Sequence, residues 1–247
     1  MTRNYGHTAE YQHIAIALKS RWHGFEALTA EMNDFIPRPL SDFESEKKEQ
    51  LANLIKHNPT QPIEDLEKFV NSQIISIASE SMQFHGRFYD RFMTEYVTVI
   101  LLSHALCEAI INAILAIGLG QANSKELFPL IERADIKEKW CIAPKCFDSS
   151  YELPTHSALF ETLNRLTKLR NAFVHHKIEL HIERTKIFDG SKFDKKPLPD
   201  EIRWLKRFFS LPYDLADYVR TRLARGIVST IILDRSPIEL ATVHKQK

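Results

Sequence analysis

The chain has 247 residues, of which 44% are hydrophobic and 26% charged, and its formal net charge is +1. This composition is typical of a globular protein and argues against a strongly basic protein that coats nucleic acid. Three cysteines, an odd number, argue against a disulfide framework and favour a reducing compartment. The first residues show no signal-peptide pattern, so we expect a cytoplasmic protein.

Glycine and proline are scarce, with 7 and 11 residues, and most prolines separate periodic segments. This pattern favours long helices over a multi-stranded sheet. Residues 8–32 carry apolar side chains at helical spacing, and a second helix of about 15 residues follows the break IPRPL, Ile36 to Leu40. A long helical pattern begins at Ile63, and we expect it to bend near Gly86.

The segment from Tyr96 to Gly120 is almost entirely apolar and long enough to cross a membrane. His104, Glu108 and Asn112 interrupt it at helical spacing, which places them on one side of a helix. A carboxylate in the centre of a lipid bilayer is costly. We therefore predict a buried helix of a bundle, whose polar stripe faces a specific partner, and we expect no membrane association.

The stretch from Gly118 to Phe147 is expected to end the apolar helix and then to form short helical turns and loop. It holds Cys141 and Cys146, whose C-x4-C spacing has His156 as its one nearby candidate ligand and no second cysteine pair. This arrangement does not predict a zinc site, and we predict neither a metal nor a cofactor. The glycine-rich motifs of nucleotide-binding enzymes and the HExxH and GxSxG motifs of common hydrolases are also absent.

An always-charged arginine interrupts the apolar face of the next helix, which Thr155 or Ser157 is expected to cap. At helical spacing, Arg170 falls within an apolar face made of Leu159, Leu163, Leu166 and Phe173. Asn171 and His175 lie together on the neighbouring flank. His175 is about 7.5 Å from Arg170 along the helix axis, so their side chains can converge on one anion.

Beyond this helix, residues 178–182 alternate apolar and polar, which predicts either a short strand or hairpin or a frayed continuation of the helix. A last helix follows, with an interruption expected near Pro212. It contains two basic stretches, RWLKRFF from Arg203 and TRLARG from Thr221. We interpret both as solvated helix faces, with contact to an RNA backbone as the alternative.

Glu108 is the only charged residue within residues 96–124, so Glu108 and Arg170 both lie in apolar helices. Burying one such charge alone is costly, whereas a hydrogen-bonded pair is tolerated. We therefore predict that the two helices pack together and that Glu108 orients Arg170. His104 and Asn112 would line the same seam.

The run LRNAFVHH, Leu169 to His176, resembles the R-(N/H/D)-x-x-x-H signature of HEPN domains, which are helical domains of many defence and toxin ribonucleases. The segment SHALCEAIINAIL resembles an earlier helix of these domains that carries a glutamate. The resemblance covers about residues 85–235. It implies an all-α, antiparallel HEPN-like bundle over residues 81–247, with residues 1–80 as an N-terminal helical extension.

The resemblance further implies a metal-independent endoribonuclease. Arg170 would stabilise charge on the scissile phosphate, Asn171 would orient the site, and His175 would act as general base or acid. The ribose 2′-OH would attack the adjacent phosphorus and leave 2′,3′-cyclic phosphate and 5′-OH ends. Glu108 and His176 are supporting candidates. Because family sites form where two domains meet, the implied partners are RNA, a second copy of the chain, and a cognate antitoxin or regulatory protein.

One position departs from a large toxin subset of the family, in which a tyrosine follows the histidine by two residues. Here that position is Lys177, which weakens assignment to the toxin pairs whose tyrosine is a modification target. Other interpretations stay open: a structural arginine at Arg170, solvated histidines at His175 and His176, and a non-catalytic dimerisation or binding module or nucleotide sensor.

Overall fold

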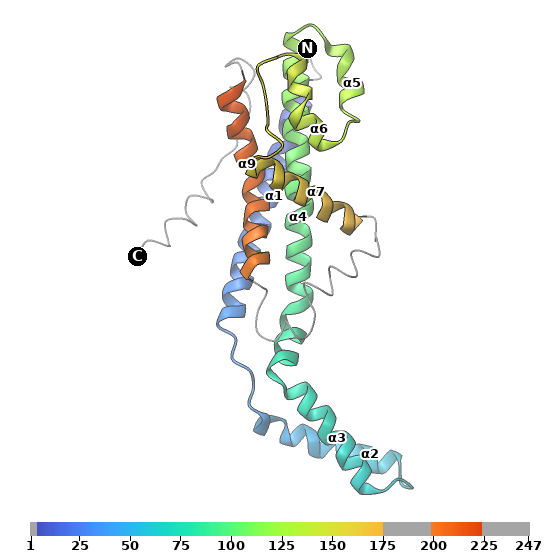
Figure 1. The fold of residues 1–247 in the computed structure, drawn as a ribbon. Coiled ribbons are helices and arrows are strands. Elements are labelled where there is room, and N and C mark those ends of the chain that lie inside the picture. The colour runs from blue at the N-terminus through green and yellow to red at the C-terminus, as the bar shows by residue number, and fades with distance from the viewer. Residues whose placement is uncertain (1–3, 175–198, 224–247) are drawn as a thin grey trace, which may run out of the picture. The chain divides into compact units, whose positions relative to one another are not determined.

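The computed structural model describes residues 4–174 and 199–223, and within them every regular element is a helix (Figure 1). The elements are α1 (Asn4–Asn33), η1 (Leu40–Phe43), α2 (Glu44–His57), α3 (Ile63–Ala78), α4 (Glu80–Gln121), η2 (Lys125–Leu127), α5 (Phe128–Ile131), α6 (Ile136–Cys141), η3 (Ala143–Cys146), α7 (Ala158–Val174) and α9 (Pro199–Arg222). The predicted all-α class is confirmed for this part of the chain. The predicted hairpin at residues 178–182 lies outside the described residues.

The described residues divide into two compact units that interleave along the chain. Unit 1 comprises residues 4–25, 95–174 and 199–223, and unit 2 comprises residues 26–94. Both α1 and α4 contribute to both units. The units therefore follow other boundaries than the division at residue 80 that the sequence suggested.

Unit 2 is centred on the pair α2 and α3, which pack against each other. Phe43, Val70 and Ile74 form its buried cluster, with Leu51, Leu54 and Ala78 against them. The helix α4 continues through Gly86, where a bend was predicted, and the long helical pattern breaks at Ser79, whose backbone is extended. The Ser79 hydroxyl donates to the Ser76 carbonyl (2.7 Å) and accepts from the Met82 amide (3.4 Å), so one side chain caps both helix ends.

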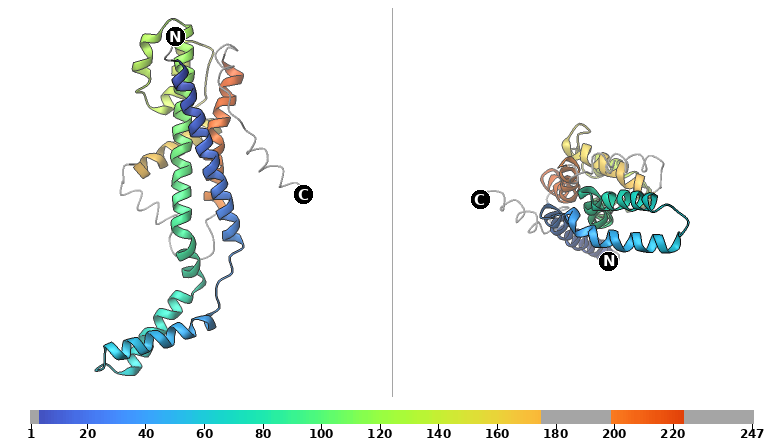
Figure 2. Two further views of the ribbon diagram at one scale, coloured as in Figure 1. Left: turned by 180° about the vertical axis from the view of Figure 1, so that it is seen from behind. Right: turned by 90° about the horizontal axis from the view of Figure 1, so that it is seen from below.

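Unit 1 is built around the second part of α4, residues 95–121. The first part of α1 and α7 lie on opposite sides of α4, and α9 runs beside it (Figures 1 and 2). Side chains of α4 that are completely buried include Leu106, Cys107, Ile110, Ile111 and Ile114. The apolar segment is thus the core helix of this unit, as its periodicity predicts.

Length and composition would also allow α4 to span a membrane. Its stretch Met82–Gln121 contains an 18-residue window with a mean hydropathy of 2.0, and 56% of that window is buried inside the protein. The helix stops where the sequence predicts, because Asn123 adopts a left-handed conformation (φ 55°) and the Ser124 amide donates to the Leu119 carbonyl at 2.9 Å.

The last described helix, α9, packs on both α7 and α1. The indole of Trp22 stacks on the Phe209 ring at 4.5 Å between centroids. The predicted interruption at Pro212 is wrong, since α9 continues through this residue. Pro212 lacks an amide hydrogen, but its neighbours Leu211 and Tyr213 are buried, and their packing offsets the missing backbone hydrogen bond.

Candidate functional site

The conspicuous arginine of the sequence lies on α7, at the edge of the buried face. Leu163 and Leu166 are fully buried, whereas Arg170 and Asn171 are half-buried. The Ser157 hydroxyl accepts from the Phe160 amide at 3.2 Å, which confirms the predicted N-cap. The capped helix therefore places Arg170 where its stem covers apolar surface and its head reaches the boundary with solvent.

Asn171 holds the guanidinium directly. Its side-chain oxygen accepts a hydrogen bond from Nη1 of Arg170 at 3.0 Å. The next candidates in the motif, His175 and His176, lie outside the described residues. Of the predicted site residues, the structure thus brings Arg170 and Asn171 together on one helix.

The predicted pairing of Glu108 with Arg170 is wrong in the described structure. The Glu108 carboxylate instead accepts a hydrogen bond from Nζ of Lys139 on α6, at 3.0 Å. The Lys139 side chain is completely buried, while that of Glu108 is 40% exposed. A buried ammonium needs a carboxylate more than a half-buried guanidinium does, which explains the exchange of partner.

Sequence reasoning missed Lys139, although a signal was present. Ile136, Lys139 and Trp140 have helical spacing and are all buried on α6. The lysine thus interrupts an apolar face in the same way as Arg170 does on α7. Because α6 has only six residues, within a segment predicted to be short turns and loop, its periodicity is too short to predict a buried face from the sequence.

Arg170, in turn, forms no ion pair with a carboxylate of the described residues. It does act on His104, which is 6% exposed on α4. Burial, and after it the positive charge of Arg170, lowers the pKa of His104. Lys139 acts in the same direction, and Glu108 and Asp135 act against it. The three helices α4, α6 and α7 therefore share one charged cluster, in which the guanidinium has no neutralising partner among the described residues.

The remaining member of the predicted polar stripe, Asn112, is half-buried, and its side-chain oxygen is buried. The Oδ1 atom of Asn112 has no hydrogen-bond partner within the described part of the chain. His104, Glu108 and Asn112 thus behave as the periodicity predicts, as a polar stripe inside an apolar helix. The partner of the stripe differs from the prediction, because Glu108 contacts Lys139 on α6 rather than Arg170 on α7.

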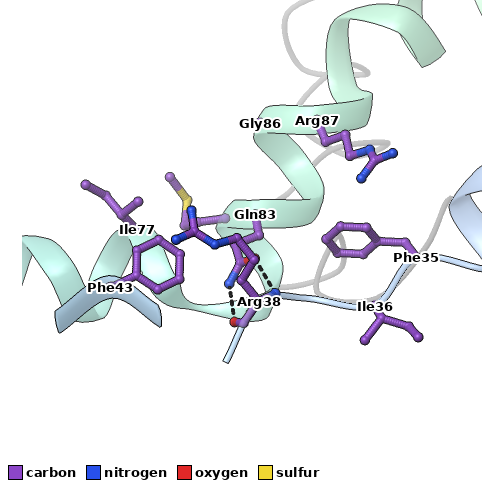
Figure 3. Close-up of a pocket in the computed structure, with 9 residues that line it drawn as sticks. Phe35, Ile36, Arg38, Phe43, Ile77, Gln83, Gly86 and Arg87 are labelled. Atoms are coloured by element: carbon purple, nitrogen blue, oxygen red, sulfur yellow. Dashed lines mark hydrogen bonds between the residues drawn. The ribbon is translucent and has the colours of Figure 1, made fainter. Parts of the chain in front are cut away.

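A separate pocket of about 370 Å³ lies in unit 2, lined by Phe35, Ile36, Arg38, Phe43, Ile77, Met82, Gln83, Gly86 and Arg87 (Figure 3). Its two cations are already engaged: Arg38 lies 4.3 Å from the Phe43 ring centroid and pairs with Glu46, and Arg87 pairs with Glu31. The Arg38 backbone amide donates to Oε1 of Gln83 at 2.8 Å, and Nε2 of Gln83 donates to the Arg38 carbonyl at 2.9 Å. The pocket holds no residue of the predicted site and no group suited to acid–base chemistry.

In the described residues, His, Cys, Asp and Glu side chains do not gather in groups of three that could hold a metal ion. Cys141 is half-buried and Cys146 exposed, and both are reduced. Burial raises the pKa of the Cys141 thiol, which disfavours the thiolate that a metal would bind.

Comparison with known proteins gives no relative. No family model, no curated protein and no solved structure matches the chain.

Proposed function

We propose that the chain is a metal-independent endoribonuclease of the HEPN type, acting as a bacterial toxin or phage-defence effector in the cytoplasm. RNA is its proposed substrate, and a homodimer that contributes two copies of the motif is its proposed active form. An antitoxin or regulatory protein is a further proposed partner. The observation that carries the proposal is Arg170, half-buried beside Asn171 and without a carboxylate partner among the described residues.

An arginine in this state suits the charge that develops in phosphoryl transfer. Its planar donors match phosphate oxygens, and partial burial strengthens each such contact. Asn171 fixes one end of the guanidinium, so less orientation is lost when an anion binds. The pKa of His104, which burial lowers most, is lowered further by the positive charge of Arg170, and this supports a charged guanidinium near the seam.

In the proposed reaction, the ribose 2′-oxygen forms a bond to the adjacent phosphorus and the bond to the 5′-oxygen breaks. His175 accepts the 2′-OH proton, or donates a proton to the leaving 5′-oxygen, and a second His175 from the partner copy suits the other transfer. The step consumes no water and no cofactor. Its products are a 2′,3′-cyclic phosphate and a 5′-OH end.

The test is cleavage of an RNA pool by the purified full-length chain in EDTA. We expect the RNA products to carry cyclic phosphate ends. An oligonucleotide with 2′-deoxyribose throughout should not be cleaved, because it lacks the attacking 2′-OH. Arg170→Ala and His175→Ala should each lower the rate by about 10²-fold or more. Lys168→Ala, an exposed residue of the same helix, is the matched control and should cleave like the wild type. Activity that persists in both variants would refute the proposal.

A second candidate function is a non-catalytic dimerisation or binding module, or a nucleotide sensor, in which Arg170 is a structural element. The electrostatic effect of Arg170 on His104, whose pKa it lowers after burial, favours this alternative. It predicts that Arg170→Ala lowers the melting temperature markedly and that the wild type does not cleave RNA. A melting temperature raised by one member of a nucleotide panel would identify the sensor.

A further inference from the structure

A tryptophan and two arginines form a compact group where α7 meets α9. The guanidinium carbon of Arg165, on α7, lies 4.1 Å from the centroid of the Trp204 ring, and that of Arg207 lies 4.8 Å from it. Both distances are well within the range of cation–π contacts. The two guanidinium groups therefore cannot be farther apart than the sum of these distances.

Trp204 differs from the other tryptophans of the chain. Trp22 and Trp140 are buried, with 4% and 0% of their surface exposed, whereas Trp204 is half-buried. Arg207 is exposed. The ring and its arginines thus form a platform that solvent reaches, which we call the Trp204 platform: Arg165, Trp204 and Arg207.

The platform carries more positive charge than its surroundings neutralise. One carboxylate, that of Glu201, lies 3.8 Å from Arg165 and also accepts a hydrogen bond from the Tyr96 hydroxyl at 3.2 Å. Arg207 has no carboxylate partner among the described residues. From Ile202 to Ser210, α9 carries three cations and no acidic residue.

This concentration of charge has a physical consequence. Two cations closer than the Debye length of about 8 Å to 10 Å repel each other with little screening, so their proximity costs free energy until an anion binds. The ring restricts both guanidinium groups, which lowers the entropy lost when they bind an anion. Phosphates at short intervals along an RNA strand fit such a pair. The half-buried indole, whose ring also lies 5.9 Å from the Phe208 ring between centroids, leaves part of its surface to solvent for contact with a base.

We propose that the Trp204 platform binds single-stranded RNA, with Arg165 and Arg207 on phosphates and a base against Trp204. This inference rests on the proposed function, in that RNA is taken as the substrate. Arg165 and Arg170 are about 7.5 Å apart along α7 and about 140° apart around it. The platform and Arg170 thus lie on different flanks of α7, and in this proposal the platform takes nucleotides that flank the scissile phosphate, while Arg170 takes the phosphate itself.

The test is the binding of a 2′-O-methyl oligonucleotide, which has no nucleophile and cannot be cleaved. Fluorescence anisotropy gives the affinity of the full chain between about 50 mM and 200 mM salt. Arg165→Gln with Arg207→Gln should weaken binding about tenfold or more, and the slope of log K against log salt should fall in magnitude by about 1.4, or about 0.7 for each phosphate contact. Arg133→Gln with Lys48→Gln removes the same charge from exposed positions elsewhere and should leave both quantities unchanged.

Tryptophan fluorescence gives a second measurement that does not depend on the double variant folding. The oligonucleotide should quench the wild-type emission, and Trp204→Phe, which keeps an aromatic ring, should abolish that quenching. Quenching that persists in Trp204→Phe contradicts the proposal. An unchanged affinity and salt slope in the folded arginine variant overturns it as well.

Two further outcomes separate the possibilities. Polyglutamate that competes as well as RNA at equal charge would mean that the platform recognises any polyanion, and the assignment to RNA would be wrong. If the protein binds RNA through the Trp204 platform but cleaves no RNA, the binding site is supported and the proposed nuclease activity is refuted.

Discussion

Unit 1 buries polar and charged side chains, whereas unit 2 keeps its charges at the surface. The buried polar residues of the described chain are Ser103, His104, Lys139, Thr162 and Thr167, and all belong to unit 1. In unit 2, Glu31 pairs with Arg87 at 2.9 Å and with Arg91 at 2.8 Å, but both arginines are more than half exposed. Ion pairs of similar length therefore lie in very different surroundings, and among the described residues the completely buried charge, that of Lys139, belongs to unit 1.

The buried charge of unit 1 is a stronger sign of a functional site than the exposed ion pairs of unit 2. Exposed pairs are worth little to stability because water solvates each partner alone. Burying a charge is costly, and strongly perturbed charges cluster at functional sites, so a buried charge marks a candidate site. The charged cluster of α4, α6 and α7 meets that description, and it contains the half-buried Arg170.

The largest expected effect comes from the buried pair. Glu108→Gln should lower the free energy of unfolding by about 3 kcal/mol or more, because it leaves the completely buried Lys139 without its carboxylate. Lys139→Met should change it by less than about 1 kcal/mol, since Glu108 is 40% exposed and water can solvate it. Urea unfolding measures both. If both substitutions lowered the free energy of unfolding equally, Glu108 and Lys139 would be buried alike. The difference between a buried charge in unit 1 and exposed charges in unit 2 would then be smaller than the structure indicates.

The next effect compares two glycines of the same helix, one in each unit. A Cβ at Gly118 would lie 2.6 Å from ring atoms of Phe147, whereas one at Gly86 would have no neighbour within 4 Å. Gly118→Ala should therefore destabilise by about 1–3 kcal/mol through overpacking. Gly86→Ala should stabilise by about 0.5–1 kcal/mol, because alanine favours the helix. Adding Phe147→Leu to Gly118→Ala should reduce the destabilisation. If Gly86→Ala lowered the free energy of unfolding instead of raising it, Gly86 would be packed more closely than the structure shows.

A smaller effect concerns pH in unit 1. Because burial and Arg170 lower the pKa of His104, the unfolded chain takes up a proton near pH 6.5 while the folded chain does not. Stability should therefore fall as the pH drops from about 6.5 toward the lowered pKa. In the His104→Gln variant, the free energy of unfolding should no longer fall over this pH range. Urea unfolding at several pH values measures it. In NMR titrations, Arg170→Gln should raise the pKa of His104. An unchanged pKa would mean that the charge of Arg170 does not act on His104.

The smallest effect is expected from the exposed pair of unit 2. Hydrogen bonds from Arg91 first, and then from Arg87, lower the pKa of Glu31. The stability they contribute is present above the ordinary pKa of a glutamate, about 4.3, and is lost as the pH falls through the lowered value. Glu31→Gln should remove this acid dependence with little change at neutral pH. A loss at neutral pH as large as that of Glu108→Gln would contradict the contrast between the units.

Local signals in the sequence accounted for much of the fold. The Ser157 cap of α7, the end of α4 near Asn123 and the apolar face of α4 all depend on residues a few positions apart, and all are confirmed. The interruption expected at Pro212 failed because packing of both neighbours outweighs one lost hydrogen bond. The break of the long helical pattern at Ser79 was not predicted, and the hydroxyl of Ser79 supplies hydrogen bonds to both helix ends there.

For the candidate site, the sequence by itself determined that Arg170 and Asn171 share one helix and that Arg170 interrupts its apolar face. It also determined that Glu108 lies in an apolar helix and needs a cation. Only the tertiary structure decided which cation, because Lys139 is 31 residues away on a short helix and its burial depends on the packing of three helices. Periodicity reports the face on which a side chain lies, whereas the partner of a buried charge is set by the distances and the exclusion of water that packing creates.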